Sequence, residues 1–270
     1  MKRAFLIFLG LATGVFAVGD GVKAGWQAIA DYQTDEALQI FTRESQSPDA
    51  TVARAARFGR GVALLTKQPV TTSQVDEARK IFAELADGGT DEPAQAGRFF
   101  LARVAQHHQE NPDPTEAARQ FRQLIAEHEN SVWAQSALSR LGLLQLYELD
   151  LNLSPAERVA EAEKLLLKAH APTAEGELHI AIAEAIFFYR LPEQAALPHL
   201  LAAERLGGYD RIGRADVLVQ IGELSRLAGK KEQAKKFYHL FLKENPRDTA
   251  NYTVRVRLAE LEGHPIEPQK

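Results

Sequence analysis

Few residues in the sequence have the types and spacing that catalysis or metal binding requires. His107 and His108 are the only adjacent histidines, and a metal site needs imidazoles that converge on one ion. Adjacent residues on a helix point about 100° apart, so both rings cannot easily reach one ion. We therefore interpret this pair as a polar helix end beside a loop.

The other short motifs also favour structure over chemistry. Gly88 and Gly89 lack the Lys-Ser/Thr that completes a phosphate-binding loop, and the sequence has no Gly-x-Ser-x-Gly turn or Gly-x-Gly-x-x-Gly turn. Neighbouring carboxylates such as Asp91 with Glu92, and Glu161 with Glu163, are expected to be solvated charges of helices or loops. The sequence thus predicts a protein without enzymatic activity, cofactor or metal ion.

Composition narrows the class of protein. The 270 residues are 45% hydrophobic and 25% charged, which is ordinary globular usage, and long alternating runs of Val, Ile and Thr are missing. The formal net charge is −4, without the basic stripe expected of a nucleic-acid-binding protein. The chain contains no cysteine, so disulfides, thiolate chemistry and a lipid-modified N-terminal cysteine are excluded.

The N-terminus has the pattern of a secretory signal. Lys2 and Arg3 precede an apolar run over residues 4–18, and Val15-Phe16-Ala17 offers the small or apolar residues that signal peptidase accepts. We predict a Sec-type signal over residues 1–17, with cleavage as late as residue 24 as an alternative, and a periplasmic or secreted protein. An uncleaved anchor is the competing interpretation, but roughly 20 apolar residues are needed to span a bilayer.

The elements that fill the rest of the chain are helical hairpins, and the clearest covers residues 218–246. Two amphipathic segments flank Gly229, and Pro246 ends the second. Gly222 and Ala234 are small where the two helices would cross, so their axes can approach, and Tyr238 lies one turn beyond Ala234. A hairpin of this kind leaves apolar faces that only neighbouring hairpins can bury.

The second-helix pattern, an alanine followed four residues later by a large apolar residue, recurs along the whole chain at separations of 41, 39, 45, 34 and 38 residues. The six pairs are Ala37/Phe41, Ala78/Phe82, Ala117/Phe121, Ala162/Leu166, Ala196/Leu200 and Ala234/Tyr238. The additional residues fall in stretches rich in Pro, Gly, Ser and Thr, which we interpret as loops. Pro198 predicts a kink or a late helix start.

The spacing in residues 218–246 resembles that of the tetratricopeptide repeat, whose 34-residue unit has small residues at positions 8 and 20 and an aromatic residue at position 24. Residues 121–142 are also similar to a sequence pattern found in bacterial periplasmic members of that family. The matching residues are Phe121, Leu124, Ile125, Ser131, Ala134, Ala137, Leu141 and Gly142. The resemblance implies an all-α fold, a right-handed α-solenoid of about five to six hairpins over residues 20–248. A capping helix over 249–263 and a tail over 264–270 would follow.

In this family pattern the first helices of the hairpins line a concave groove, and positions 2, 5, 9, 12 and 13 project into it. The resemblance therefore implies these candidate partner-binding residues: Ser136, Ser139, Leu143, Tyr147, Leu178, Phe188, Tyr189, Asp216, Glu223 and Arg226. The middle of this groove is apolar and aromatic. It could seat a peptide, or Phe187, Phe188 and Tyr189 could be core residues, and the sequence leaves both open.

The function favoured by these patterns is an exported adaptor that binds a protein or peptide partner in the bacterial cell envelope, without stable membrane insertion after signal cleavage. Two alternatives remain. One is an all-α envelope enzyme, for example one that acts on glycans, with carboxylates brought together from separate repeats. The other is a scaffold held in the membrane by an uncleaved N-terminus.

Overall fold

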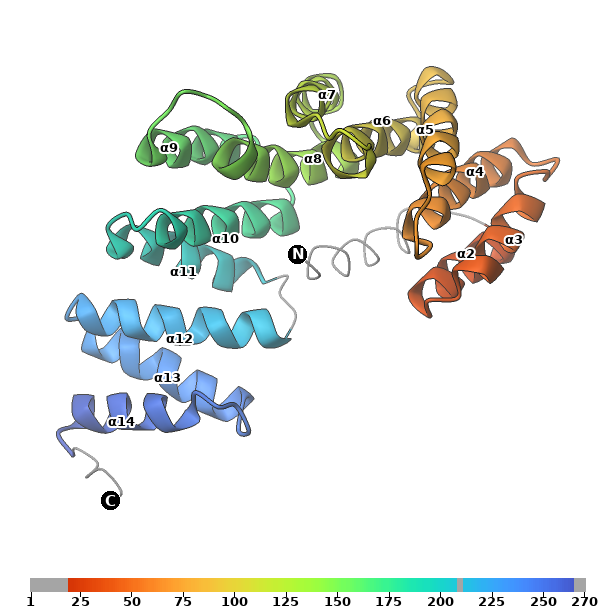
Figure 1. Cartoon of the computed structure of the whole chain (residues 1–270). Helices are drawn as coiled ribbons and strands as arrows, with labels where there is room; N and C mark the ends of the chain where they lie inside the picture. The colour runs from red at the N-terminus through yellow and green to blue at the C-terminus, as the bar shows by residue number, and fades with distance from the viewer. Residues whose placement is uncertain (1–18, 208–210, 265–270) are drawn as a thin grey trace. The chain divides into compact units, whose positions relative to one another are not determined.

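The computed structural model describes residues 19–207 and 211–264, and within these ranges all regular secondary structure is helical (Figure 1). Consecutive helices form six hairpins and a final single helix. The hairpins are α2 (Asp20–Ala30) with α3 (Thr34–Glu44), α4 (Ala50–Thr66) with α5 (Thr72–Asp87), α6 (Glu92–Arg103) with α7 (Pro114–Glu127), α8 (Val132–Leu143) with α9 (Pro155–Leu166), α10 (Pro172–Phe188) with α11 (Ala196–Leu206), and α12 (Arg211–Leu227) with α13 (Lys231–Glu244). The predicted all-α array of five to six hairpins is confirmed.

The chain divides into two compact units. The N-terminal unit extends to Ala137 and the C-terminal unit begins at Leu138, so the boundary falls within α8. The predicted signal over residues 1–17 and the tail beyond His264 lie outside the described residues. In the ranges that the structure covers, no helix has both the length and the apolar character that a membrane span requires.

The alanines of the second helices lie where the hairpins are most tightly packed. All six are fully buried at 0% exposure, as the repeated pattern predicted: Ala37, Ala78, Ala117, Ala162, Ala196 and Ala234. The large residues four positions later are also buried, except Leu166, which is only partly covered. Alanine at these positions allows close helix crossing, because a larger side chain would separate the two axes.

Glycines of the first helices lie against the large side chains of the second helices. A Cβ atom on Gly59 would lie 2.3 Å from the ring of Phe41, and one on Gly25 would lie 2.6 Å from that ring. The Phe41 ring is therefore enclosed between α2 and α4 where only glycine leaves space for it. In the last hairpin, Gly222 faces the Tyr238 ring in the same way, at 2.4 Å.

The core of the N-terminal unit is a continuous set of aromatic rings. The ring of Phe58 lies 5.7 Å from that of Trp26, 5.3 Å from Phe100 and 5.4 Å from Trp133, measured between centroids. Edge-on and tilted aromatic contacts of this kind contribute about 0.5–1.5 kcal/mol each beyond their buried area. Side chains from α2, α4, α6 and α8 thus share one core.

Two hairpins have first helices that end in a widened turn. The π-helical segments η1 (Val104–His108) and η2 (Leu144–Glu148) follow α6 and α8 directly. In each the last bond spans five residues, from the Gln109 amide to the Val104 carbonyl and from the Leu149 amide to the Leu144 carbonyl. Sequence patterns did not reveal these turns, because each lies at the end of its helix, where too few residues follow to display the shifted apolar periodicity.

Loop positions and helix starts largely agree with the sequence. Ser154 caps α9 through a capping box with Glu157, and the expected late start near Pro198 is present as the 3-10 turn η3 (Glu193–Ala195) before α11. The final helix, α14 (Asn251–Glu262), is followed by Gly263 as its C-cap. It begins two residues later than expected, because Asp248 accepts from the Ala250 amide in a turn before the helix.

Substitution of Gly97 by alanine tests the close approach of the helices. A Cβ on this residue of α6 would lie 2.7 Å from the Phe82 carbonyl oxygen of α5, which is backbone and cannot move alone. Alanine favours a helix interior over glycine by about 1 kcal/mol, yet we expect net destabilisation of about 1–3 kcal/mol. Chemical denaturation of the purified protein measures this difference.

Gly142→Ala is a second variant for which we expect a smaller loss of stability. Its Cβ would lie 2.7 Å from the Cδ2 atom of Leu178, which is the end of a side chain. A side-chain end adjusts more easily than a carbonyl, so its cost should be smaller. Equal or greater stability of Gly97→Ala relative to the wild type would contradict the close packing of α5 on α6.

Candidate partner-binding surface

The predicted partner-binding residues lie on the first helices of three successive hairpins, in α8 with η2, in α10 and in α12. Ser136 belongs to the N-terminal unit, is half-buried, and donates its hydroxyl proton to the Val132 carbonyl at 2.9 Å. The other nine belong to the C-terminal unit. Of these, Tyr147, Phe188 and Asp216 are exposed, and Leu143, Tyr189, Glu223 and Arg226 are half-buried.

Two predicted surface residues are buried, and for these the prediction is wrong. Ser139 is 3% exposed, and its hydroxyl lies 3.5 Å from the Ala174 carbonyl oxygen. Leu178 is 0% exposed and packs against Gly142. Both side chains join α8 to α10, so neither is accessible to a partner.

The error at Leu178 has a physical cause in the alignment of α10 with α12. The two helices match with an offset of 39 residues, which places the buried Ala183 at the position of Gly222 and Leu178 at that of the buried Val217. The predicted set on α10 is therefore one residue too late. The corrected surface positions are Glu177, Ile180, Glu184, Phe187 and Phe188, all of which are exposed or half-buried.

Three aromatic side chains of the predicted set do come together at the ends of η2 and α10. Tyr147 and Phe188 meet edge-on with centroids 5.4 Å apart, and Tyr147 stacks on Tyr189 at 6.1 Å. The Tyr189 hydroxyl donates to the Leu146 carbonyl, which fixes its ring. Phe188 is 69% exposed, and hence this aromatic cluster is a surface feature with one strongly exposed ring.

A carboxylate lies beside the aromatic cluster. Burial, followed by the negative charge of Glu184 and the neighbouring Tyr189, raises the pKa of the Tyr147 phenol well above its usual value. Tyr147 therefore stays protonated and keeps its hydrogen-bond donor. Glu184 lies one turn before Phe188 on α10, so the exposed ring and the carboxylate occupy the same side of the helix.

Glu223 and Arg226 form hydrogen bonds and ion pairs within the protein. Glu223 accepts from the Tyr238 hydroxyl at 2.6 Å and from Arg226 Nη2 at 2.8 Å, and Arg257 of α14 lies 3.7 Å away. Burial alone would raise the pKa of Glu223, but the hydrogen bonds from Tyr238 and Arg226 and the charges of Arg226 and Arg257 lower it overall. This network connects α12, α13 and α14.

A comparison with known families identifies the fold. The tetratricopeptide-repeat family model matches residues 216–248, the α12–α13 hairpin that contains Gly222, Ala234 and Tyr238. This hairpin is therefore similar to a tetratricopeptide repeat. Repeats of this family stack into scaffolds for protein–protein interaction.

Among solved structures, this chain is similar to a thermophilic TPR protein of Thermus thermophilus. The sequence identity is 19% and the TM-score is 0.44, over 78% of this chain and 99% of that chain. No curated protein matches the sequence.

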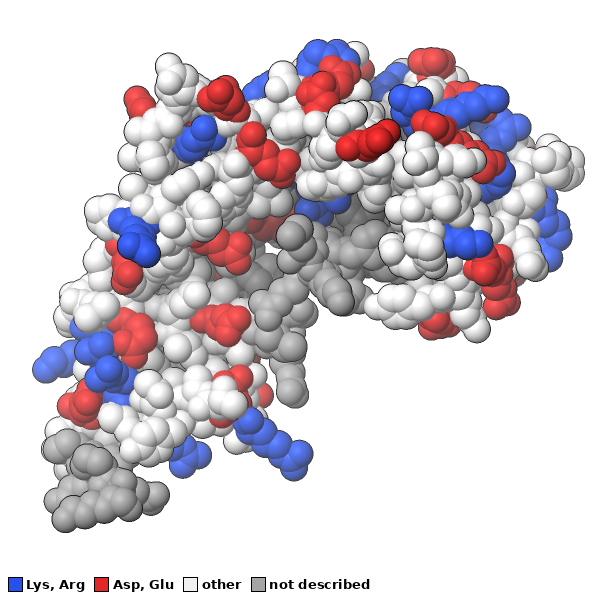
Figure 2. Space-filling model, in the orientation of Figure 1, with Lys and Arg blue, Asp and Glu red and all other residues white. Residues whose placement is uncertain are grey.

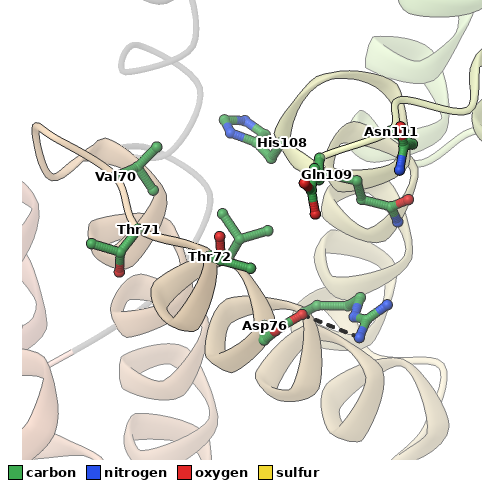
Figure 3. A pocket seen from close by; sticks show the side chains of 10 residues that line it. Val70, Thr71, Thr72, Asp76, His108, Gln109 and Asn111 are labelled. Atoms are coloured by element: carbon green, nitrogen blue, oxygen red, sulfur yellow. Dashed lines mark hydrogen bonds and ion pairs between the residues drawn. The ribbon is translucent and has the colours of Figure 1, made fainter.

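Of the two adjacent histidines, His108 borders a pocket of about 520 Å³ in the N-terminal unit (Figure 3). His108 lies across this pocket from Thr71, Thr72 and Asp76 of α5 and its cap, and Asp76 pairs with Arg79. Burial, followed by the charge of Arg103, lowers the pKa of His108. Among the residues that the structure describes, no three His, Cys, Asp or Glu side chains are grouped to hold a metal ion.

Carboxylates singled out in the sequence have structural roles. Asp91 caps α6 and forms a two-pronged pair with Arg54, with both N···O distances 2.8 Å. Glu161 pairs with Lys164 on the surface of α9. On the face visible in Figure 2, acidic and basic side chains are interspersed without a continuous basic stripe.

A pair of histidines in the C-terminal unit escaped the sequence analysis, because they are 20 residues apart on different helices. The Nδ1 atoms of His179 and His199 lie 2.9 Å apart, and His199 Nε2 lies 3.2 Å from Glu163 Oε1. If His199 donates to Glu163, its Nδ1 accepts from His179 and both rings are neutral. Burial, followed by the charges of His199 and Arg205, lowers the pKa of His179 to about 4, and burial outweighs Glu163 in lowering the pKa of His199.

These lowered pKa values predict acid sensitivity of the C-terminal unit. The unfolded chain binds protons to histidine near pH 6.5, whereas folded His179 resists protonation until about pH 4. The stabilisation is therefore complete above about pH 6.5 and is lost as the pH falls towards 4, by about 1–3 kcal/mol. Glu163, Glu175 and Arg205 face the pair from α9, α10 and α11.

Denaturant titrations at several pH values check this expectation with the variant His179→Gln/His199→Gln. Its free energy of unfolding should fall less steeply than that of the wild type between pH 6.5 and 4. Identical slopes in the two proteins would show that the pair does not contribute. His239→Gln is the matched control, because this exposed histidine pairs only at the surface with Glu262.

Proposed function

We propose that this chain is an exported, non-enzymatic adaptor of tetratricopeptide type that binds a protein or peptide partner of the bacterial cell envelope. The binding surface is the first-helix face of the C-terminal unit, defined by the exposed and half-buried residues of η2, α10 and α12 described above. This proposal joins the signal-like N-terminus of the sequence to a fold that serves as a scaffold for protein partners.

The exposed aromatic cluster is the observation that carries the proposal. Tyr147, Phe188 and Tyr189 are held together by ring contacts and by the hydrogen bond from Tyr189 to the Leu146 carbonyl. Preordered rings lose little conformational entropy on binding, and aromatic anchors of this kind provide most of the energy of many interfaces. Leu227, which is 59% exposed, extends the apolar surface onto α12.

The position of α2 favours one end for the proposed signal. Cleavage after Ala17 leaves all of α2, which begins at Asp20, in the mature protein. Cleavage at residue 24 would remove Val22, which is 0% exposed in the core of the first hairpin. Loss of a fully buried valine costs about 1.5–3 kcal/mol of burial free energy, so the earlier site is the better one.

Crosslinking in cells followed by affinity purification tests the binding surface. The wild-type protein should capture a defined envelope partner, and Phe188→Ala should reduce the captured amount by about tenfold, because the variant removes the most exposed ring of the cluster. Leu167→Ala is the matched control, since Leu167 is 84% exposed after the second helix α9. Equal losses from both variants, or no loss from Phe188→Ala, would contradict binding through the cluster.

Mass spectrometry of the protein purified from its native envelope tests export. The expected mature N-terminus is Val18. A mature chain that retains Met1 would refute signal cleavage, and one that begins after Ala24 would refute the requirement for Val22 in the core.

A further inference from the structure

Positive charge is concentrated near the end of the chain, in α13 and the residues on either side of it. Residues 229–257 contain eight Lys or Arg and three Asp or Glu, which gives them a formal net charge of +5. The whole chain has a net charge of −4, so the remaining residues together carry −9. The total therefore conceals a local excess of positive charge, and an asymmetry of this kind favours an anionic partner.

Most of these positive charges have no counterpart among the residues that the structure describes. The Glu232 carboxylate pairs with Lys235 at 3.2 Å, and that of Glu244 pairs with Arg214 at 2.8 Å. Arg257 likewise pairs with two glutamates. The six other cations are exposed, and none forms an ion pair within the described ranges: Lys230, Lys231, Lys236, Lys243, Arg247 and Arg255.

The exposed side of α13 presents two of these unpaired lysines. Lys236 and Lys243 are seven residues apart, or about two turns, and they lie opposite Tyr238 and Phe241, which are 0% exposed. The half-buried Leu240 lies between the two lysines on the same side of the helix. This side of α13 is therefore cationic, with an apolar residue at its middle.

Both ends of α13 extend the set of cations. Lys230 and Lys231 lie at its start, and Arg247 lies three residues beyond its last residue. A helix of 14 residues is about 21 Å long, so the charges are spread over an extended surface. We define the basic surface as the five cations of α13 and its two ends: Lys230, Lys231, Lys236, Lys243 and Arg247.

We propose that the basic surface binds an anionic phospholipid membrane and holds the protein against it without insertion. Its Lys and Arg side chains pair with the phosphates of the lipid headgroups, and Leu240 faces the headgroup layer between them. The surface lies on a second helix, whereas the aromatic cluster lies on η2 and α10. The inference therefore goes beyond the adaptor function, because one protein can hold a partner and a membrane at different faces.

The spacing of the cations favours a membrane over a single anion. Lys236 and Lys243 are about 10 Å apart along the helix, so they do not converge on one phosphate. A bilayer presents a phosphate to each of them, and each Lys or Arg close to an anionic leaflet adds to binding. Separate contributions of this kind require no pocket.

The residue types also favour a membrane over an acidic protein segment. Four of the five cations of the basic surface are lysines. Lysine is a point charge on a flexible stem, which suits mobile headgroups, whereas a fixed carboxylate is held better by the planar fork of arginine. The fluid surface of a lipid leaflet thus fits this face better than an ordered peptide.

Co-sedimentation with vesicles tests the inference on the mature protein, without the apolar residues 1–17 that would themselves favour lipid. Vesicles of phosphatidylcholine are compared with vesicles of equal parts phosphatidylcholine and phosphatidylglycerol. Partition into the anionic vesicles should be at least about tenfold greater, and high salt should abolish the difference because it screens exposed charges. Equal partition into both kinds of vesicle would overturn the inference.

Lys236→Glu/Lys243→Glu should reduce partition into the anionic vesicles by about tenfold or more, because two charges facing the lipid are reversed. Lys80→Glu/Arg122→Glu is the matched control. It makes the same change in net charge at exposed positions on the second helices α5 and α7. Equal losses in both double variants would show that net charge alone governs binding, and would refute the basic surface.

Two further measurements separate a membrane from other anions and from the adaptor function. Inorganic phosphate at the concentration of the lipid phosphate should not release the protein, and a labelled polyglutamate peptide should bind at least about tenfold more weakly than the vesicles. Release by phosphate, or equal binding of the peptide, would overturn the membrane assignment. Phe188→Ala should retain vesicle binding, and its loss in that variant would place the lipid contact at the aromatic cluster and refute the basic surface.

Discussion

The structure depends on contacts in which a large side chain on one helix occupies the space left by a glycine or alanine on another. The Phe41 ring fills the space above Gly25 and Gly59, and Tyr238 does so above Gly222. These contacts set how closely the helices approach, and close packing leaves little freedom for adjustment. Because the buried side of each first helix is fixed in this way, its opposite side is fixed as well. The exposed residues of α10 and α12, such as Phe188 and Leu227, are thus placed by the core.

The second helices could be predicted well from the sequence, and the first helices less well. An alanine with a large residue four positions later marks a buried stripe in every hairpin, and all six alanines are buried. The first helix of the fifth hairpin has Ala183 where the last has Gly222, and alanine is common in any helix. Its alignment was therefore ambiguous by one residue. A shift of one residue rotates every assignment by about 100°, which moved Leu178 to the surface and overlooked Glu184.

The sequence identified three aromatic residues of the candidate surface, but not the contacts that hold its polar residues. Tyr147, Phe188 and Tyr189 were identified from their repeat positions, and they do form one cluster. The partners that hold Glu223, and the contact between His179 and His199, join residues that are 15 and 20 positions apart. Such pairs arise from the packing of separate helices, and local periodicity carries no information about them. The chemistry of the surface follows from these long-range contacts as much as from the residue types.

The two π-helical turns show how a repeat protein accommodates changes in length. An additional residue within η1 or η2 is accommodated as a local bulge at the end of a first helix, where buried side chains such as Val104 and Leu146 still pack in the core. These bulges change the length of a first helix while its buried contacts are kept. They also redirect whatever follows them, including Tyr147 in η2. The widened turn of η2 is consequently part of what places Tyr147 against Phe188 at the surface of the C-terminal unit.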